Sequence, residues 1–545
     1  MRQFKILALS TLLLTGVAAC GDLVVPNTND PDAEQALQNP GDVESLISGS
    51  WVNWWFNTQN IGFLGPMLST MSFQHSAWPA NFGMVLYSAI PRPGTGNDPA
   101  AQFYSQFSSV YTYLYRAIAA SNDGLRALVP LGTVELTGTG ADRNRNDRAR
   151  AFARYVQGIS YGYLAMTFTN GPVVDETTDL AAGVEFVDYM ELRDVAIRYL
   201  DEAISIANSS DFEIPTTWGF TPEPVTSAQL ARVASSYKAR IRAATARTPE
   251  ERAAVNWPTV LSEINAGVTS DFSYENTGTW PQWQQMLLYT LFYQWSQMPY
   301  WVFGMADQSE KYQQWMSMPT DQKHPDLGTG TPFIIQTPDL RFPQGADRAA
   351  QLADQVQRKS ELRFCAAGPG CPTATASPGG QWGQAGRGTW RWSYYRDNRD
   401  PSFTAYAATV PDISMVEMNM LAAEAYYRTG NPDQAALLVN ITREAAGLNA
   451  TDAAGTNTSC VPKLPNNSCG GLLEMIKWEK RMLAAHNNGF MGAMMYFEGR
   501  GWGDLYAGTI LSWPVPAIVA ELEGQPIEQV GGGQAWSAPV GTYGY

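Results

Sequence analysis

Two sets of residues in this chain have types and spacings that could support hydrolysis. The run Gly158–Gly162 places Ser160 in the G-x-S-x-G pattern of serine hydrolases, a motif that needs a strand, a sharp turn and a helix to expose the nucleophile. This run lies within a segment of helical periodicity, so close helix packing explains it better. Glu474 and Glu479 lie on a predicted helix beside lysines and arginines. They are interpreted as a solvated or ion-paired face, although a carboxylate pair for glycoside hydrolysis assembles only in the fold and stays open.

Metal and cofactor chemistry has little support in the sequence. The three histidines, His75, His324 and His486, are far apart, which removes the usual general base from most schemes. The chain contains no H-E-x-x-H motif, no G-x-x-x-x-G-K-[ST] loop and no dinucleotide-binding fingerprint. We therefore predict no cofactor and no metal site.

Four of the five cysteines form two local pairs, Cys365 with Cys371 and Cys460 with Cys469. In an exported protein such pairs predict short disulfide loops. The alternative is a zinc site, but zinc ligands usually follow closer C-x2-4-C spacings, and no histidine lies beside either pair. We expect disulfides that hold surface loops.

The fifth cysteine, Cys20, follows a basic start and the apolar run Ile6–Ala19, with small residues just before it. These are the marks of a secretory signal. The run is shorter than the roughly 20 residues needed to span a bilayer as a helix. Val17–Cys20 matches a lipobox, so we predict cleavage before Cys20 and acylation of its side chain; the alternative is a plain signal peptide with an incidental cysteine.

Aromatic residues give the strongest indication of binding. Trp, Tyr and Phe make up 12% of the chain, with 18 Trp, and many lie in stretches rich in Gly and Pro. A flat ring with a polar edge suits a sugar face. Core packing is the better explanation for any single ring, but as a set they favour a binding platform. The ligand-binding candidates are Trp78, Tyr87, Trp280, Trp283, Tyr300, Trp301, Trp390 and Trp392.

The elements that must position these rings are predicted to be mainly helices. Apolar residues recur at spacings of three and four over 103–128, 152–166, 192–207 and 228–246, each giving one apolar stripe. Periodicity fades between 269 and 414, where loops are expected.

One helix pair, residues 415–448, carries a more specific pattern. Tyr426 and Gly430 are followed by Ala435, as in tetratricopeptide repeats. Pro432 is allowed in the first turn of the second helix.

The predicted organisation is a signal peptide at 1–19, a tether at 20–41, helical repeats at 42–268, and a C-terminal region at 269–545 that contains the loop-rich block 269–414 and the repeat pair 415–448.

The net charge of −15 argues against nucleic acid as a partner, because nucleic-acid binding rests on neutralising phosphates with Lys and Arg. An acidic protein is also repelled by an anionic membrane surface, which favours an acyl anchor.

Several ordered motifs together resemble the SusD/RagB-like nutrient-binding outer-membrane lipoproteins. The motifs that carry the resemblance are Leu23–Pro31, Phe168–Val174, Ala228–Ala246, Glu424–Pro432, Glu479–Arg481, Glu498–Leu505 and Trp513–Pro516. The cysteine pairs are not a general feature of that family. Its ligand residues are poorly fixed in sequence, so none is transferred to this chain.

The resemblance implies an α-helical superhelix with tetratricopeptide-like repeats and an irregular, loop-rich second half. It implies capture of an oligosaccharide, or in some members a peptide, without catalysis. It also implies an outer-membrane location facing the cell exterior and a SusC-like TonB-dependent β-barrel transporter as the partner. A helical-repeat scaffold whose only partner is the transporter, and a lipid-anchored hydrolase, are the competing hypotheses.

Overall fold

The computed structural model is mainly helical, as the sequence predicts. It describes residues 36–59, 64–74, 76–77, 87, 89, 92, 96–101, 104–277, 279, 282, 296–319, 333–358, 362, 364–366, 383–384, 389–390, 393, 395–397, 407–484 and 491–529. The helices of the first half are α3 (Pro40–Thr58), α4 (Leu64–Met71), α6 (Tyr104–Ala127), α7 (Arg145–Thr167), α8 (Tyr189–Ser209), α9 (Thr216–Gly219), α10 (Ser227–Ala244), α11 (Pro249–Ala253) and α12 (Trp257–Asn265).

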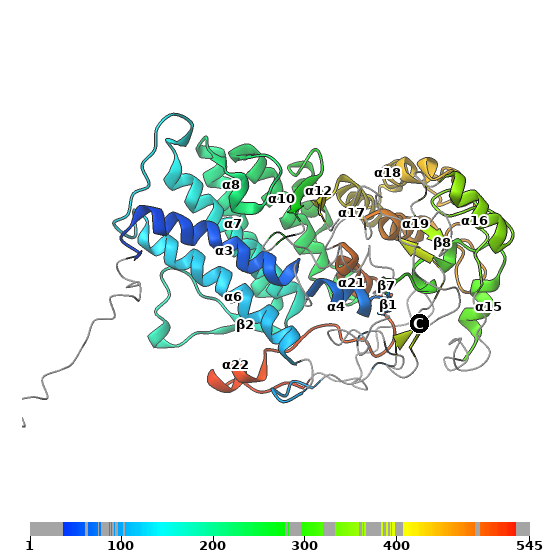
Figure 1. Ribbon diagram of the computed structural model, residues 1–545, viewed down its shortest axis with the longest axis horizontal. Coiled ribbons are helices and arrows are strands. Elements are labelled where there is room, and N and C mark those ends of the chain that lie inside the picture. Colours follow the sequence, from blue (N-terminus) through cyan, green and yellow to red (C-terminus); the bar gives the residue numbers. More distant parts are fainter. Residues whose placement is uncertain are drawn as a thin grey trace, which may run out of the picture.

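These helices pack mostly against their neighbours in the chain, from α3 through α6, α7, α8 and α10 to α12, and form one side of the molecule (Figure 1). Their apolar stripes meet in one large core. Glycines allow the close approach: a Cβ at Gly158 would lie 2.6 Å from Cγ of Leu200, and one at Gly162 would lie 2.3 Å from Cδ1 of Ile241. Ser160, between them, is completely buried within α7, so this run packs helices and exposes no nucleophile.

The start of the first helix is fixed by its capping residue. Asn39 and Asp42 are both of types that cap helices, and the N-cap is Asn39, whose side chain accepts a hydrogen bond from the Gly41 N–H at 2.9 Å. Pro40 occupies the first turn, where its missing N–H costs nothing. Asp42 instead lies within the first turn, where a negative charge is favourable next to the helix dipole.

The predicted repeat pair is present as α17 (Met415–Arg428) and α18 (Pro432–Ala445). Gly430 ends the turn with φ of +81°, a conformation that glycine adopts without a steric cost. Ala435 is fully buried in the core that α17 and α18 share with the next helix. The remaining helices of the second half are α14 (Tyr300–Phe303), α15 (Lys311–Ser317), α16 (Arg348–Gln357), α19 (Leu472–Glu479), α21 (Met491–Trp502) and α22 (Ala517–Leu522).

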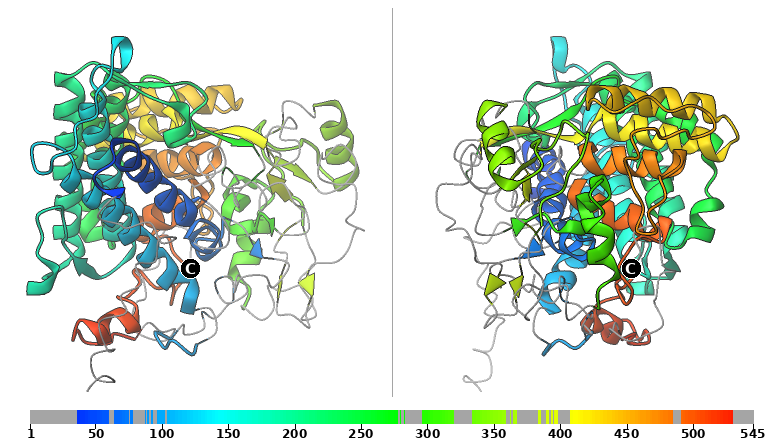
Figure 2. Two further views of the ribbon diagram at one scale, coloured as in Figure 1. Left: turned by 60° about the vertical axis from the view of Figure 1, so that its left-hand side comes forward. Right: turned by 90° about the vertical axis from the view of Figure 1, so that its right-hand side faces the viewer.

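Short antiparallel strand pairs supply most of the other regular structure. They join β1 (Ser76–Ala77) to β7 (Ser296–Gln297), β2 (Asn170–Pro172) to β3 (Phe186–Asp188), β4 (Glu213–Ile214) to β5 (Val225–Thr226), β6 (Phe272–Thr277) to β12 (Ala407–Ile413), β8 (Phe364–Ala366) to β11 (Tyr395–Asp397), and β9 (Gly383–Gln384) to β10 (Thr389–Trp390). The strands and short helices between 296 and 397 lie on the side of the molecule away from α6, α7 and α8 (Figure 2). They enclose a second core.

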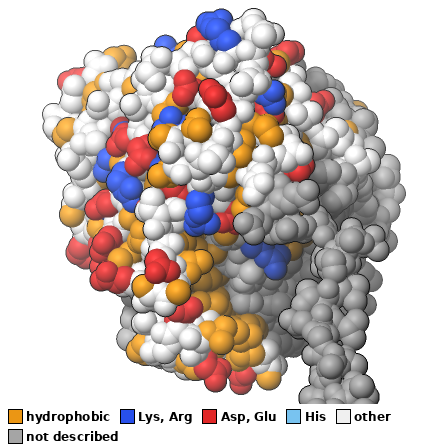
Figure 3. Space-filling view, turned by 90° about the vertical axis from the view of Figure 1, so that its left-hand side faces the viewer, with side chains coloured by type: hydrophobic (Ala, Val, Ile, Leu, Met, Phe, Trp, Pro, Cys, Tyr) orange, Lys and Arg blue, Asp and Glu red, His pale blue; other side chains and the backbone are white. Residues whose placement is uncertain are grey.

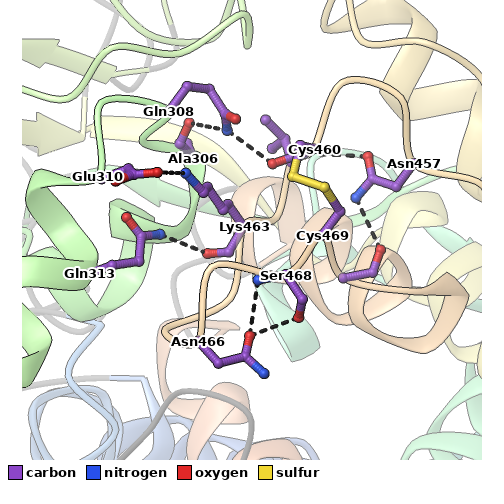
Figure 4. Close-up of a disulfide and its surroundings, with 12 residues drawn as sticks. Ala306, Gln308, Glu310, Gln313, Asn457, Cys460, Lys463, Asn466, Ser468 and Cys469 are labelled. Atoms are coloured by element: carbon purple, nitrogen blue, oxygen red, sulfur yellow. Dashed lines mark hydrogen bonds and ion pairs between the residues drawn. A yellow bond between two sulfur atoms is a disulfide. The ribbon is translucent and has the colours of Figure 1, made fainter.

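Cys460 and Cys469 form a disulfide with a Cα–Cα distance of 4.7 Å. The loop it closes rests on the segment before and within α15 (Figure 4). Gln308 donates to the carbonyl oxygen of Cys460 at 2.9 Å, and Gln313 donates to that of Lys463 at 3.2 Å. The disulfide therefore closes a loop that these hydrogen bonds hold against the second core. The other predicted pair is not described as a whole, because Cys371 lies outside the described residues.

Buried ion pairs connect the two halves of the chain. Arg240 on α10 binds Glu417 on α17 at 2.7 Å, and Arg252 on α11 binds Glu424 on α17 at 2.6 Å.

Glu479 was expected on a solvated or ion-paired face. It is ion-paired, with Arg341 at 2.8 Å, but it is fully buried. A buried carboxylate keeps its charge only when it is paired and hydrogen-bonded.

Candidate functional site

The candidate aromatic segments converge where four short strands meet. β1 pairs antiparallel with β7, with Ser76 opposite Gln297 and Ala77 opposite Ser296. β10 lies beside β1, and β11 lies beside β7. Residues from positions near 76, 296 and 389 in the sequence are thereby brought to one place, next to α4 and α21 in Figure 1. We call this meeting point the strand junction.

The strand junction joins the ends of the segments that carry the candidate tryptophans. Trp78 directly follows β1, Trp280 and Trp283 precede β7, and Trp392 follows β10. These four residues lie outside the described residues, and Trp390 is described only in its backbone, as part of β10.

Tyr300 and Trp301 are core residues, which contradicts their expected role in an exposed platform. Each is only 2% exposed. The Trp301 ring stacks on Phe73 at a centroid distance of 4.4 Å and meets Trp315 edge-on at 4.9 Å. Tyr300 stacks on Phe333 at 3.9 Å. Because other rings cover their faces, both residues pack in the second core instead of facing a ligand.

Tyr87 is also buried, at 3% exposure. Its hydroxyl donates to Oε1 of Gln106 at 3.0 Å, and its ring meets Trp513 edge-on. Burial raises the pKa of Tyr87 well above its usual value. The predicted ligand contact is wrong at this position, because the ring packs against α6 and the 513 segment.

Arg92 is a residue of this region that the sequence did not single out. Its guanidinium lies 4.4 Å from the Phe73 ring centroid, donates to the carbonyl oxygen of Met71 at 2.6 Å and donates to Oγ1 of Thr509 at 3.0 Å. It also donates to the carbonyl oxygen of Tyr87. Arg92 thus ties the chain between 87 and 92 to the end of α4 and to the C-terminal segment. Its flanking sequence, Ile90-Pro91-Arg92-Pro93, carries no pattern that would have shown this.

No group of three or more His, Cys, Asp or Glu side chains that could hold a metal ion occurs within the described ranges. On the face shown in Figure 3, acidic and basic side chains are interspersed. In the described part of the chain, no helix has the length and apolar character to cross a membrane.

The sequence matches no protein-family model and no curated protein. Solved structures are similar in fold. A SusD homologue from Parabacteroides distasonis has a TM-score of 0.54 at 14% identity, covering 85% of each chain. A SusD-like carbohydrate-binding protein from Bacteroides fragilis has a TM-score of 0.53 at 13% identity, covering 86% of this chain and 87% of that one. A SusD superfamily protein from Bacteroides vulgatus has a TM-score of 0.51 at 13% identity, covering 91% and 99%.

These likenesses extend over most of this chain and include both the helical stack and the irregular second half. The chain therefore has the SusD-like fold, as its ordered sequence motifs predict.

Proposed function

We propose that this protein is a lipid-anchored, cell-surface glycan-binding protein that delivers an oligosaccharide to a SusC-like TonB-dependent transporter. One observation carries the proposal. Three aromatic-bearing segments that are distant in sequence meet at the strand junction, in a chain with the fold of a SusD-like protein described as carbohydrate-binding.

A layer of packed aromatic rings, close in sequence to β1 and β7, suits this role. Phe73, Trp301 and Trp315 form a close-packed aromatic layer, and Arg92 clamps its edge. Binding residues held on a rigid support lose less conformational entropy when the ligand arrives. Tryptophans carried by segments anchored at β1 and β7 can therefore offer ring faces to a sugar at low entropic cost.

The proposed role includes no catalysis. The two carboxylates that could have formed a glycosidase pair are both engaged: Glu479 with Arg341 at 2.8 Å and Glu474 with Lys477 at 3.1 Å. Both carboxylates are therefore held in ion pairs inside the fold, which supports binding without turnover.

The anchor and the transporter partner rest on the N-terminal sequence and the fold. Acylated Cys20 would retain the protein at the membrane, and the tether between Cys20 and the start of α3 would leave the folded part free to move over a transporter. Protease treatment of intact cells tests the placement: digestion of the chain supports the cell exterior, and full protection contradicts it.

Titration of a soluble form that begins after Cys20 tests glycan binding. We expect affinity for at least one oligosaccharide in a broad panel, with no new product on prolonged incubation. Trp280→Ala and Trp283→Ala should each weaken binding at least tenfold. The matched control is Tyr427→Ala, which removes a ring that is 40% exposed on α17, far from the strand junction in sequence, and should leave affinity unchanged. Binding of a peptide panel without any saccharide binding would contradict the glycan proposal.

A further inference from the structure

A pocket lies where the start of α10 faces the start of β6. Its volume is about 300 Å³, at the lower end of the range for ligand pockets. Its apolar part includes the half-buried ring of Phe272 and the side chains of Val225 and Val233.

Polar side chains without protein partners surround this apolar part. The Glu223 carboxylate and the hydroxyls of Ser270, Ser273 and Thr409 line the pocket, and none of them has a hydrogen-bond or ion-pair partner in the described part of the chain. Arg232 also lines it and uses one guanidinium N–H on the carbonyl oxygen of Gly267, at 3.2 Å. The pocket therefore offers an anionic acceptor, a cationic donor and several hydroxyls around one ring.

This combination matches a sugar residue better than a purely apolar ligand. A sugar has a ring face of C–H groups, which can lie on an aromatic ring, and a rim of hydroxyls, which both donate and accept hydrogen bonds. Side chains that keep free donors and acceptors next to such a ring can satisfy that rim.

The strand β6 runs from this pocket to Thr277, three positions before Trp280 in the sequence. Ser273, Glu275 and Thr277 share one face of β6, because successive side chains alternate, and on β12 Thr409 lies opposite Glu275. Glu275, Thr277 and Thr409 are exposed. The six residues of β6 span about 20 Å at roughly 3.4 Å per residue.

We propose that this pocket is a second saccharide-binding site, which holds one residue of a glycan long enough to reach the strand junction along the exposed face of β6 and β12. The inference rests on the proposed function and extends it, because it assigns the ligand a minimum length. Short oligosaccharides occupy the strand junction alone, and long ones occupy both sites.

Calorimetric titration with a size series, from disaccharides to decasaccharides of α-1,4-glucan, β-1,3-glucan, β-1,4-glucan and xylan, tests the inference. In the series that binds, affinity should rise at least fivefold between short and long chains. Ser270→Trp, which fills the pocket mouth from an exposed position, and Glu223→Gln should abolish that rise without changing the affinity for short chains. Ser262→Trp, an identical change at an exposed position of α12 outside the pocket, should preserve it.

The possible failures are distinguishable. Length-independent affinity in the unmodified protein, or a rise that survives Ser270→Trp and Glu223→Gln, overturns the second site and leaves the proposed function intact. Failure of every series to bind overturns both. If peptides, and not monosaccharides, abolish the additional affinity for long glycans, the pocket binds a peptide and the inference is overturned.

Discussion

Replacing Arg252 by Ala removes one of the two buried cations that join the two halves of the chain. Its guanidinium binds both oxygens of Glu424, at 3.0 and 2.6 Å, also binds Glu498, and donates to the carbonyl oxygen of Ala243 at 2.8 Å. The side chain is fully buried. Its loss leaves two buried carboxylates with Arg428 and Lys480 as their remaining charged partners.

The expected cost is large because a buried charge loses its main partner. Removing one member of a buried ion pair costs about 3–5 kcal/mol of unfolding free energy. With roughly 2.1 cal/mol/K of unfolding entropy per residue, a folded part of about 500 residues has about 1 kcal/mol/K. The melting temperature should therefore fall by about 3–5 °C.

Differential scanning calorimetry of the soluble form measures this shift. Arg143→Ala is the control, because Arg143 and Asp211 form an ion pair in which both side chains are more than half exposed; a surface pair of this kind is worth about 0–1 kcal/mol. Equal shifts for Arg252→Ala and Arg143→Ala would refute the reasoning, since burial would then add nothing to the cost of losing the cation.

Three further predictions concern stability. Although burial alone would raise the pKa of Glu424, Arg252 holds it well below the usual value of 4.5. The stabilisation from this pair is therefore present above about pH 4.5 and is lost as the pH falls further. Melting curves should show that acid lowers the melting temperature of the unmodified protein more steeply than that of Arg252→Ala. Trp301→Ala should cost about 3–5 kcal/mol because it opens a cavity beneath Phe73; an unchanged melting temperature would place that ring outside the core. Replacing Cys460 and Cys469 together by Ser should cost about 2–3 kcal/mol, from loss of a constraint on a short loop, and equal melting temperatures for the two proteins would contradict this.

The helical half could be predicted from sequence because its signals are local. Residues three and four apart lie on one helix face whatever the rest of the chain does, so the apolar stripe over 152–166 predicts α7. Tyr426, Gly430 and Ala435 specify a turn and a close helix contact within ten positions. The start of α3 is also decided locally: Asn39 and Asp42 are both good capping residues, and Pro40, which favours the first turn of a helix, selects Asn39.

The site could be predicted only as a set of segments. Trp280 and Trp301 have similar neighbours in sequence, rich in aromatic and turn residues. Trp301 is buried because Phe73, more than two hundred positions earlier, stacks on it, and no local pattern reports such a contact. The contacts of Arg92 could not be predicted for the same reason, because its partners Met71 and Thr509 belong to distant parts of the chain.

The pairing of β1 with β7 has an evolutionary consequence. Two residues on each strand determine where the segments carrying Trp78 and Trp280 depart from the scaffold and return to it. Lengthening a closed loop is inexpensive, at about 0.6 kcal/mol for each doubling. Insertions, deletions and exchanges between these fixed ends can therefore accumulate while the helical stack stays intact. Proteins with this fold can therefore change these surface segments rapidly while they retain one inherited framework.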